Sequence, residues 1–150
     1  MKVNGFSLIE VLVATAIVMG GVATLAQLFV VSGDATRVAS GTSVAVLLAQ
    51  QKMEDLRAAP GSPGVSPPGA LAADTEGFVD YLDAAGGVLA GAGAAPMPAG
   101  TLYIRRWSIH ALTAGILHVV VFHVLVMPAH GARAGDGIVR LVSVRRQQED

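Results

Sequence analysis

The chain has 150 residues, of which 53% are hydrophobic, and its formal net charge is −1. Nothing in this near-neutral balance suggests a nucleic-acid-binding protein, which would show a basic face. The chain contains no cysteine, so disulfides and thiolate metal sites are excluded. Length and composition leave room for one small domain besides a long apolar run at the N-terminus.

The N-terminal apolar run has no charged residue from Val11 to Gly33. As a helix it would be about 34 Å long, enough to cross a hydrocarbon core of about 30 Å. Glu10 lies at its start, and an acid costs roughly 2.5–3.5 kcal/mol near a bilayer centre and less near the edge. A plain membrane anchor has no need of this residue.

Two ordinary interpretations of this run are open. A secretory signal peptide has an apolar region of about 7–15 residues before a small-residue cleavage site. Ala14-Thr15-Ala16 is similar to such a site, but the run is too long and Glu10 interrupts it. A simple signal anchor is the other interpretation, with Lys2 keeping the N-terminus in the cytoplasm. It gives Glu10 no role.

A third interpretation comes from the stretch Gly5-Phe6-Ser7-Leu8-Ile9-Glu10-Val11-Leu12-Val13-Ala14. It resembles the prepilin signature of type IV pilins and type II secretion pseudopilins, in which a short basic leader ends in Gly before Phe. A Glu follows four residues after that Phe, and then a long apolar helix. The resemblance implies a leader at 1–5, cleavage between Gly5 and Phe6, and N-methylation of Phe6. It also implies that Glu10 pairs with the Phe6 amine of an adjacent subunit.

The second part of the predicted helix is amphipathic. Apolar residues recur at helical spacing, with polar and charged residues largely on the other sides. The apolar set is Ala45, Leu48, Ala49, Met53 and Leu56, and the polar set is Gln51, Lys52, Glu54, Asp55 and Arg57. Pro60-Gly61 ends the helix. We expect a transmembrane and polymerisation segment at 6–33 and an amphipathic segment at 34–59, about 80 Å of helix in all.

The rest of the chain predicts loop and then sheet. Residues 60–100 form an Ala/Gly/Pro-rich loop region with a possible short strand at 78–82 before a Gly86-Gly87 turn. Residues 101–147 predict an antiparallel β-meander. Its strands are Leu102–Leu112, Ile116–Met127 and Ile138–Val144, with turns at 113–115 and 129–137. The fold class is α+β: a long helix on a small meander of three to four strands. These strands loosely resemble those of minor pilins.

Four histidines are the main candidates for chemistry: His110, His118, His123 and His130. His118 and His123 should face opposite sides of one strand, although His118 could approach His110 or His130. No carboxylate or cysteine completes a ligand set, so all four are interpreted as structural or exposed. Asp80 and Asp83, or Asp136, could contribute to a Ca²⁺ site, but no oxygen-rich loop has suitable spacing. No catalytic residue, metal or cofactor is predicted, and the protein is not expected to be an enzyme.

Aromatic and basic residues on the predicted strands have structural explanations. Trp107 is expected to anchor strand packing. The basic pairs Arg105-Arg106 and Arg145-Arg146 are interpreted as protection of sheet edges, with contact between subunits as the alternative.

The resemblance implies a minor pilin or pseudopilin of a type IV pilus or a type II secretion system. Its partners would be the prepilin peptidase and methyltransferase, other pilin or pseudopilin subunits, and an inner-membrane assembly platform. The protein would cross the inner membrane once, with its N-terminus cytoplasmic and its C-terminal domain periplasmic, before it joins the filament. The alternative is a monomeric membrane-anchored periplasmic binding module.

Overall fold

The computed structural model describes residues 7–60, 64–91, 96–114, 117–130 and 137–146. The chain divides into two compact units, Met1–Arg37 and Val38–Asp150. One helix, α1 (Leu8–Ala58), contributes residues to both. In the first unit α1 is the one regular element among the described residues, and every side chain from Ser7 to Arg37 is exposed.

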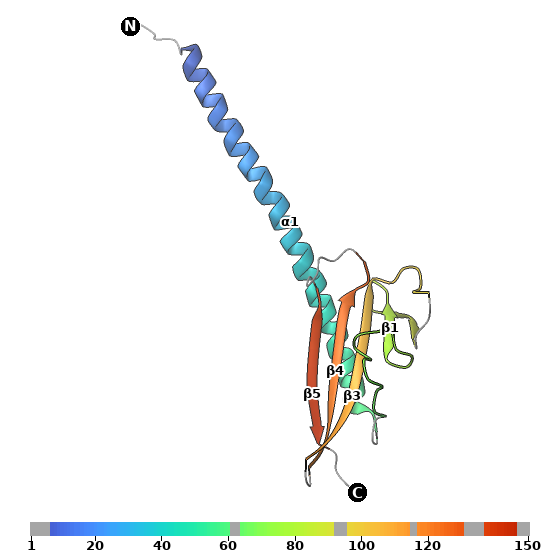
Figure 1. The fold of residues 1–150 in the computed structure, drawn as a ribbon. Helices are drawn as coiled ribbons and strands as arrows, with labels where there is room; N and C mark the ends of the chain where they lie inside the picture. Colours follow the sequence, from blue (N-terminus) through green and yellow to red (C-terminus); the bar gives the residue numbers. More distant parts are fainter. Residues whose placement is uncertain (1–6, 61–63, 92–95, 115–116, 131–136, 147–150) are drawn as a thin grey trace. The chain divides into compact units, whose positions relative to one another are not determined.

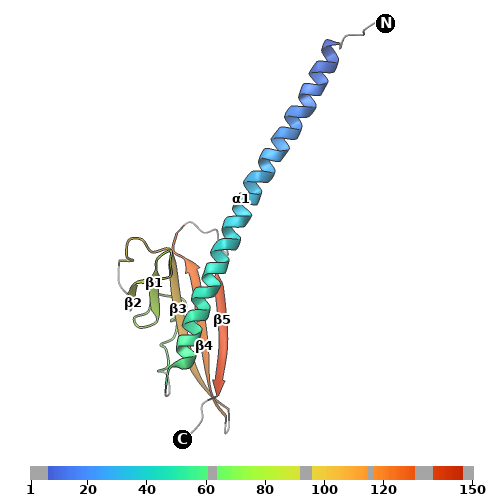
Figure 2. The ribbon, with the colours of Figure 1, turned by 180° about the vertical axis from the view of Figure 1, so that it is seen from behind.

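The second unit joins the C-terminal part of α1 to an antiparallel sheet, seen from its two sides in Figures 1 and 2. The sheet has five strands in the order β2-β1-β3-β4-β5. Their bounds are β1 (Val79–Leu82), β2 (Val88–Gly91), β3 (Tyr103–Ala114), β4 (Leu117–Pro128) and β5 (Val139–Arg146). This layout is the predicted α+β, pilin-like one. The sheet is larger than the predicted three to four strands because the β1–β2 hairpin pairs with β3.

The long strands exceed their predicted lengths. Thr113 and Ala114 were expected in a turn, but they belong to β3, which pairs with β4 from Tyr103 opposite Pro128 to Ala114 opposite Leu117. A hairpin with an uninterrupted register keeps pairing its backbone groups until the connection itself begins. Pro128 is the last residue of β4, as its missing N–H requires.

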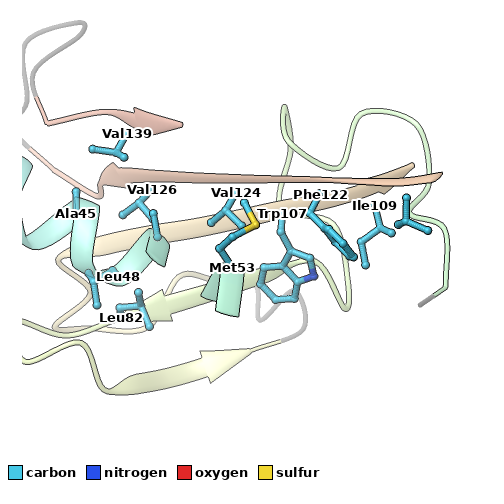
Figure 3. Packing of buried hydrophobic residues seen from close by; sticks show 12 residues of the cluster. Ala45, Leu48, Met53, Leu82, Trp107, Ile109, Phe122, Val124, Val126 and Val139 are labelled. Carbon is cyan, nitrogen blue, oxygen red and sulfur yellow. The ribbon is translucent and has the colours of Figure 1, made fainter. Parts of the chain in front are cut away.

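The hydrophobic core lies between α1 and one face of the sheet (Figure 3). The predicted stripe of α1 is confirmed, because Ala45, Leu48, Ala49 and Met53 are all buried. Alternate strand residues meet it, as the two-residue period of a strand requires. The strand residues of the core are Leu82, Trp107, Ile109, Val120, Phe122, Val124, Val126 and Val139. Trp107 is therefore a packing anchor, as expected.

A buried ionic cluster links α1 to the sheet. The Asp80 carboxylate accepts hydrogen bonds from Arg105 Nε at 3.1 Å and Nη2 at 2.7 Å, and Lys52 Nζ lies 3.3 Å from the same oxygen. Arg105 Nη1 also donates to the Leu48 carbonyl at 3.1 Å. Lys52 lies over the Trp107 ring, 3.5 Å from its centroid. Lys52 was expected to point away from the core, but its stem crosses apolar surface to reach this acid.

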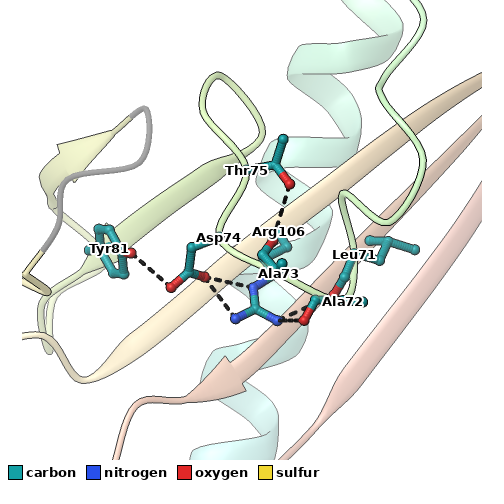
Figure 4. A network of polar contacts seen from close by, with 7 residues as sticks. All are labelled: Leu71, Ala72, Ala73, Asp74, Thr75, Tyr81 and Arg106. Atoms are coloured by element: carbon teal, nitrogen blue, oxygen red, sulfur yellow. Dashed lines mark hydrogen bonds and ion pairs between the residues drawn. The ribbon is translucent and has the colours of Figure 1, made fainter.

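The interpretation of Arg105-Arg106 as edge protection is wrong, because β3 is an internal strand. Arg106 instead binds Asp74, with Nε at 2.8 Å and Nη2 at 2.7 Å from Oδ1 (Figure 4). Asp74 Oδ2 accepts from the Tyr81 hydroxyl at 2.9 Å. Burial, and then this hydrogen bond, raise the pKa of Tyr81. The network fixes the segment before β1 over the sheet face that α1 leaves uncovered.

Two further contacts fix the helix on the sheet. Gly86, with φ of 82°, lies in the β1–β2 turn so close to α1 that an added Cβ would be 2.6 Å from Leu48 Cδ2. Arg145 of β5 donates from Nη1 to the Arg57 carbonyl at 3.0 Å and to the Ala59 carbonyl at 3.1 Å. The Arg57 carbonyl lies in the last turn of α1 and the Ala59 carbonyl just after it, where no further helical N–H is present to bind them.

Candidate assembly site

The N-terminal turn of α1 is capped by a serine. The Glu10 N–H donates to the Ser7 carbonyl at 3.0 Å and lies 3.3 Å from Ser7 Oγ. A serine followed three residues later by glutamate is the sequence of a capping box, in which the first hydroxyl binds the third helical N–H. Glu10 therefore lies in the first turn, where the helix dipole favours a negative charge.

The remainder of this unit exposes a long apolar surface. Leu8, Met19 and Phe29 have exposed fractions of 85%, 72% and 78%. The helix is long and apolar enough to cross a membrane, by length and composition. Its threonines satisfy their hydroxyls within the helix: Thr15 donates to the Val11 carbonyl and Thr24 to the Gly20 carbonyl, both at 2.8 Å. Such back-bonding leaves few polar groups in need of water.

Glu10 lies beside one apolar strip of this helix. The strip follows helical spacing and also contains Val11, Ala14, Thr15, Val18 and Met19. A carboxylate at one end of an apolar strip can accept one cation without loss of the apolar contact around it. An exposed apolar strip of this kind is typical of a surface that contacts lipid or another protein.

The other predicted assembly residues, Gly5 and Phe6, lie outside the described residues. The structure thus places Glu10 on the helix and gives no geometry for its predicted pairing with Phe6. The roles of these three residues stay predictions.

Two of the four histidines lie close together. His110 approaches His123, with ring centroids 5.7 Å apart, a pair that the sequence analysis did not predict. The reason is the register, which sets Ser108 opposite His123 and brings His110 onto the same face two residues along. Arg140 Nη2 lies 3.3 Å from His123 Nδ1. Burial lowers the pKa of His123, and the charges of Arg140 and His110 lower it further.

The candidate calcium ligands have other partners where they are described. Asp80 belongs to the buried ionic cluster, and Asp83 Oδ1 accepts the N–H groups of Ala85 at 2.9 Å and Gly87 at 2.8 Å. Asp136 lies outside the described residues. Within the described ranges, no group of three or more His, Asp or Glu side chains could hold a metal ion.

Sequence reasoning missed two features of the molecule. The Ser7-Leu8-Ile9-Glu10 capping pattern was readable, and it gives Glu10 a second, purely local role. The Lys52–Asp80–Arg105 cluster had no local signal, because its members come from three elements far apart in sequence.

Comparison with known proteins identifies one family model. The prokaryotic N-terminal methylation motif matches residues 1–23. No curated protein and no solved structure matches the chain. The motif covers the predicted leader, Glu10 and the first turns of the exposed apolar helix. The chain therefore carries a type IV pilin-like prepilin signature, followed by an α+β unit of pilin-like layout.

Proposed function

We propose that this protein is a minor pilin or pseudopilin, a structural subunit of a type IV pilus or a type II secretion pseudopilus. One observation carries the proposal: a methylation motif at residues 1–23 leads directly into an unbroken helix with exposed apolar side chains. A helix of this kind needs lipid or neighbouring helices around it. A subunit stored in a membrane and then packed into a filament has both in turn.

The proposed processing creates the group that Glu10 binds. A prepilin peptidase hydrolyses the peptide bond between Gly5 and Phe6, and water adds to the Gly5 carbonyl carbon. The leader leaves with a new carboxylate, and Phe6 keeps a free amine. The unprotonated amine then attacks the methyl group of a methyl donor, and the donor leaves with the electron pair of the broken bond to that methyl group. The product is an N-methylammonium group, which carries one positive charge.

Glu10 would then act as a register residue. Unpaired in an apolar environment its charge is unfavourable, whereas a cationic amine from the adjacent subunit offsets that cost. Only one axial offset between neighbouring helices brings the two groups together. The apolar strip beside Glu10 allows close contact at that offset.

The proposed location follows from the same segment. The uncharged stretch Val11–Gly33 would span the inner membrane, with Lys2 on the cytoplasmic side and the second unit in the periplasm. The partners would be the processing peptidase and methyltransferase, an inner-membrane assembly platform, and other pilin or pseudopilin subunits.

The test uses Glu10→Gln, because glutamine at this position keeps the capping pattern and removes only the charge. We expect normal cleavage but at least about tenfold less incorporation into filaments, the loss of one paired charge worth about 1.4 kcal/mol or more. Glu76→Gln, an exposed glutamate of the second unit, is the matched control and should assemble normally. Equal incorporation of both variants would contradict the pairing.

Mass spectrometry of the mature protein tests processing separately. The proposal requires loss of Met1–Gly5 and one added methyl group on Phe6. An intact N-terminus would instead favour the monomeric membrane-anchored binding module.

A further inference from the structure

The last strand, β5, forms one edge of the sheet. It pairs with β4 on one side only, from Val126 opposite Val139 to Val119 opposite Arg146. Alternate residues of an edge strand direct their N–H and C=O groups away from the sheet. Within the ranges that the structure describes, no backbone hydrogen bond reaches these outward groups of β5.

The side of β3 that faces away from β4 differs, because other segments of the chain pair with it. Where β1 ends, the Phe78 carbonyl accepts the Trp107 N–H at 3.1 Å. Further along, the Ile109 N–H donates to Ser66 Oγ at 3.0 Å, and the Ile109 carbonyl accepts the Ser66 N–H at 3.0 Å. Irregular segments therefore continue the pairing that β1 begins. The chain thus pairs the outer side of β3 as far as Ile109, whereas no described segment pairs with the outer side of β5.

The face of β5 that points away from α1 has a regular chemical pattern. Arg140, Val142, Val144 and Arg146 follow one another at alternate positions, and all four are exposed. Val142 and Val144 have exposed fractions of 56% and 59%. Two exposed valines between two arginines match an extended segment with the complementary order of acidic, apolar, apolar and acidic side chains.

The described strands next to this edge carry arginines and no acidic side chain. Strands β3, β4 and β5 contain no Asp or Glu. Among the described residues, neither Arg140 nor Arg146 has a carboxylate within ion-pair distance. An incoming acidic strand would gain charge complementarity that no described group of this sheet already supplies.

A second copy of β5 is poorly matched in the antiparallel register that sets Val142 opposite Val144. An antiparallel pair of β5 strands that sets Val142 opposite Val144 also sets Arg140 opposite Arg146, twice across the symmetric pair. Like charges directly opposite one another are destabilising. In that register the charge pattern disfavours a second β5 strand, whereas an acidic segment would place opposite charges at both ends.

We infer that the free edge of β5 is a docking site for an extended acidic segment of another protein, which adds as a sixth strand. Backbone hydrogen bonds supply affinity, and the arginines at 140 and 146 select acidic side chains at both ends of the segment. The inference concerns only the second unit and does not depend on processing or filament assembly.

The test is peptide binding to the full-length chain in detergent micelles, measured by fluorescence anisotropy. The probe is the peptide ETVTVTE, and KTVTVTK is its matched control. We expect the acidic peptide to bind at least about tenfold more tightly, because two ion pairs replace two repulsions. Its binding should slow amide hydrogen exchange in β5 and leave exchange in β1 unchanged.

Two variants localise the site. Arg140→Gln combined with Arg146→Gln should bring the affinities of the two peptides together. Arg37→Gln, an exposed arginine of the first unit, should leave the tenfold preference unchanged. The peptide ETPTPTE should not bind, because proline lacks the N–H that strand addition requires.

Several results would overturn the inference. One is absence of binding up to about 1 mM peptide, a free energy of only about −4 kcal/mol. Others are equal affinity for both peptides, or binding without protection of β5 amides. Binding to anionic vesicles in the absence of peptide binding would identify a membrane surface instead. In the chain without peptide, slower exchange of the β5 amides that disappears when residues 147–150 are removed would identify the chain's own C-terminus as the occupant.

Discussion

The two parts of α1 belong to one continuous helix and differ in what surrounds their apolar side chains. From Ser7 to Arg37 the side chains are all exposed. From Ala45 to Met53 an apolar stripe is buried against the sheet. The first part has no charged residue from Val11 to Gly33, whereas the second is apolar on one side. The comparison teaches that the second part is stabilised by its own chain, and that the first part requires partners supplied from outside it.

The largest expected effect is on the second part. Arg105→Ala should lower the free energy of unfolding of the second unit by about 3–5 kcal/mol, because Asp80 loses its main buried partner. Chemical denaturation in micelles, followed by Trp107 fluorescence, measures this. Arg146→Ala, at an exposed position of β5, is the control and should change stability by less than about 0.5 kcal/mol. Similar losses in both would mean that burial of Arg105 is not what matters.

A charge in the first part should act on membrane insertion instead. Val22→Asp puts an acid near the middle of the uncharged stretch and should cost about 2.5–3.5 kcal/mol of insertion free energy. Leu47→Asp makes the same kind of change at an exposed position of the second unit. Membrane fractionation should show release of the first variant and retention of the second. If both remain bound equally, the first part does not span the membrane.

The turn against α1 gives a smaller effect. Gly86→Ala should destabilise the second unit by about 1–2 kcal/mol from backbone strain and by a further ~1 kcal/mol or more from its clash with Leu48. Gly77→Ala is well matched, since its φ of 78° carries the strain but no atom lies within 4 Å of the added Cβ. Thermal unfolding should separate the two. Equal shifts would mean that Leu48 moves aside without cost.

The smallest effect is a pH dependence. The folded state lowers the pKa of His123, so the unfolded chain binds its proton more readily. Stability should therefore be constant at high pH and fall as the pH decreases from about 7.5 through the unfolded pKa of about 6.5. Denaturation midpoints between pH 8 and 5 measure this. In His123→Gln the same decline should be shallower, and an unchanged slope would assign the effect to other groups.

The sequence predicts some structural features of this molecule and not others, and the two parts of α1 differ in this respect. The prepilin signature, the helix to Ala58 and the buried stripe follow from local patterns, and the structure confirms the helix and the stripe. Strand β2 was missed, because Val-Leu-Ala-Gly in an Ala/Gly-rich region has no alternation that would mark it. The partners of Lys52 and Arg106 depend on which strand lies beside which, and no local pattern carries that information.

The candidate functional residues were also predicted from the sequence to different extents. Glu10 was singled out because a charge is anomalous in an apolar run, which is a local observation. The closeness of His110 to His123 depends on the β3–β4 register, and the sequence analysis did not predict it. An unusual residue type in a local pattern can therefore be recognised from the sequence, whereas contacts between side chains on different strands can be identified only from the fold.

The contact of Arg145 with the end of α1 has a mechanical consequence. The helix is attached to the sheet at Leu48 and Lys52 through the Asp80–Arg105 pair, and again at Arg57 and Ala59 through Arg145. A force along the helix axis acts on both attachments at once, because both hold the same helix to the same sheet. The force is thereby divided between β1 and β3 at one attachment and β5 at the other. Both attachments must break together before the helix slides along the sheet, so it does not detach one turn at a time.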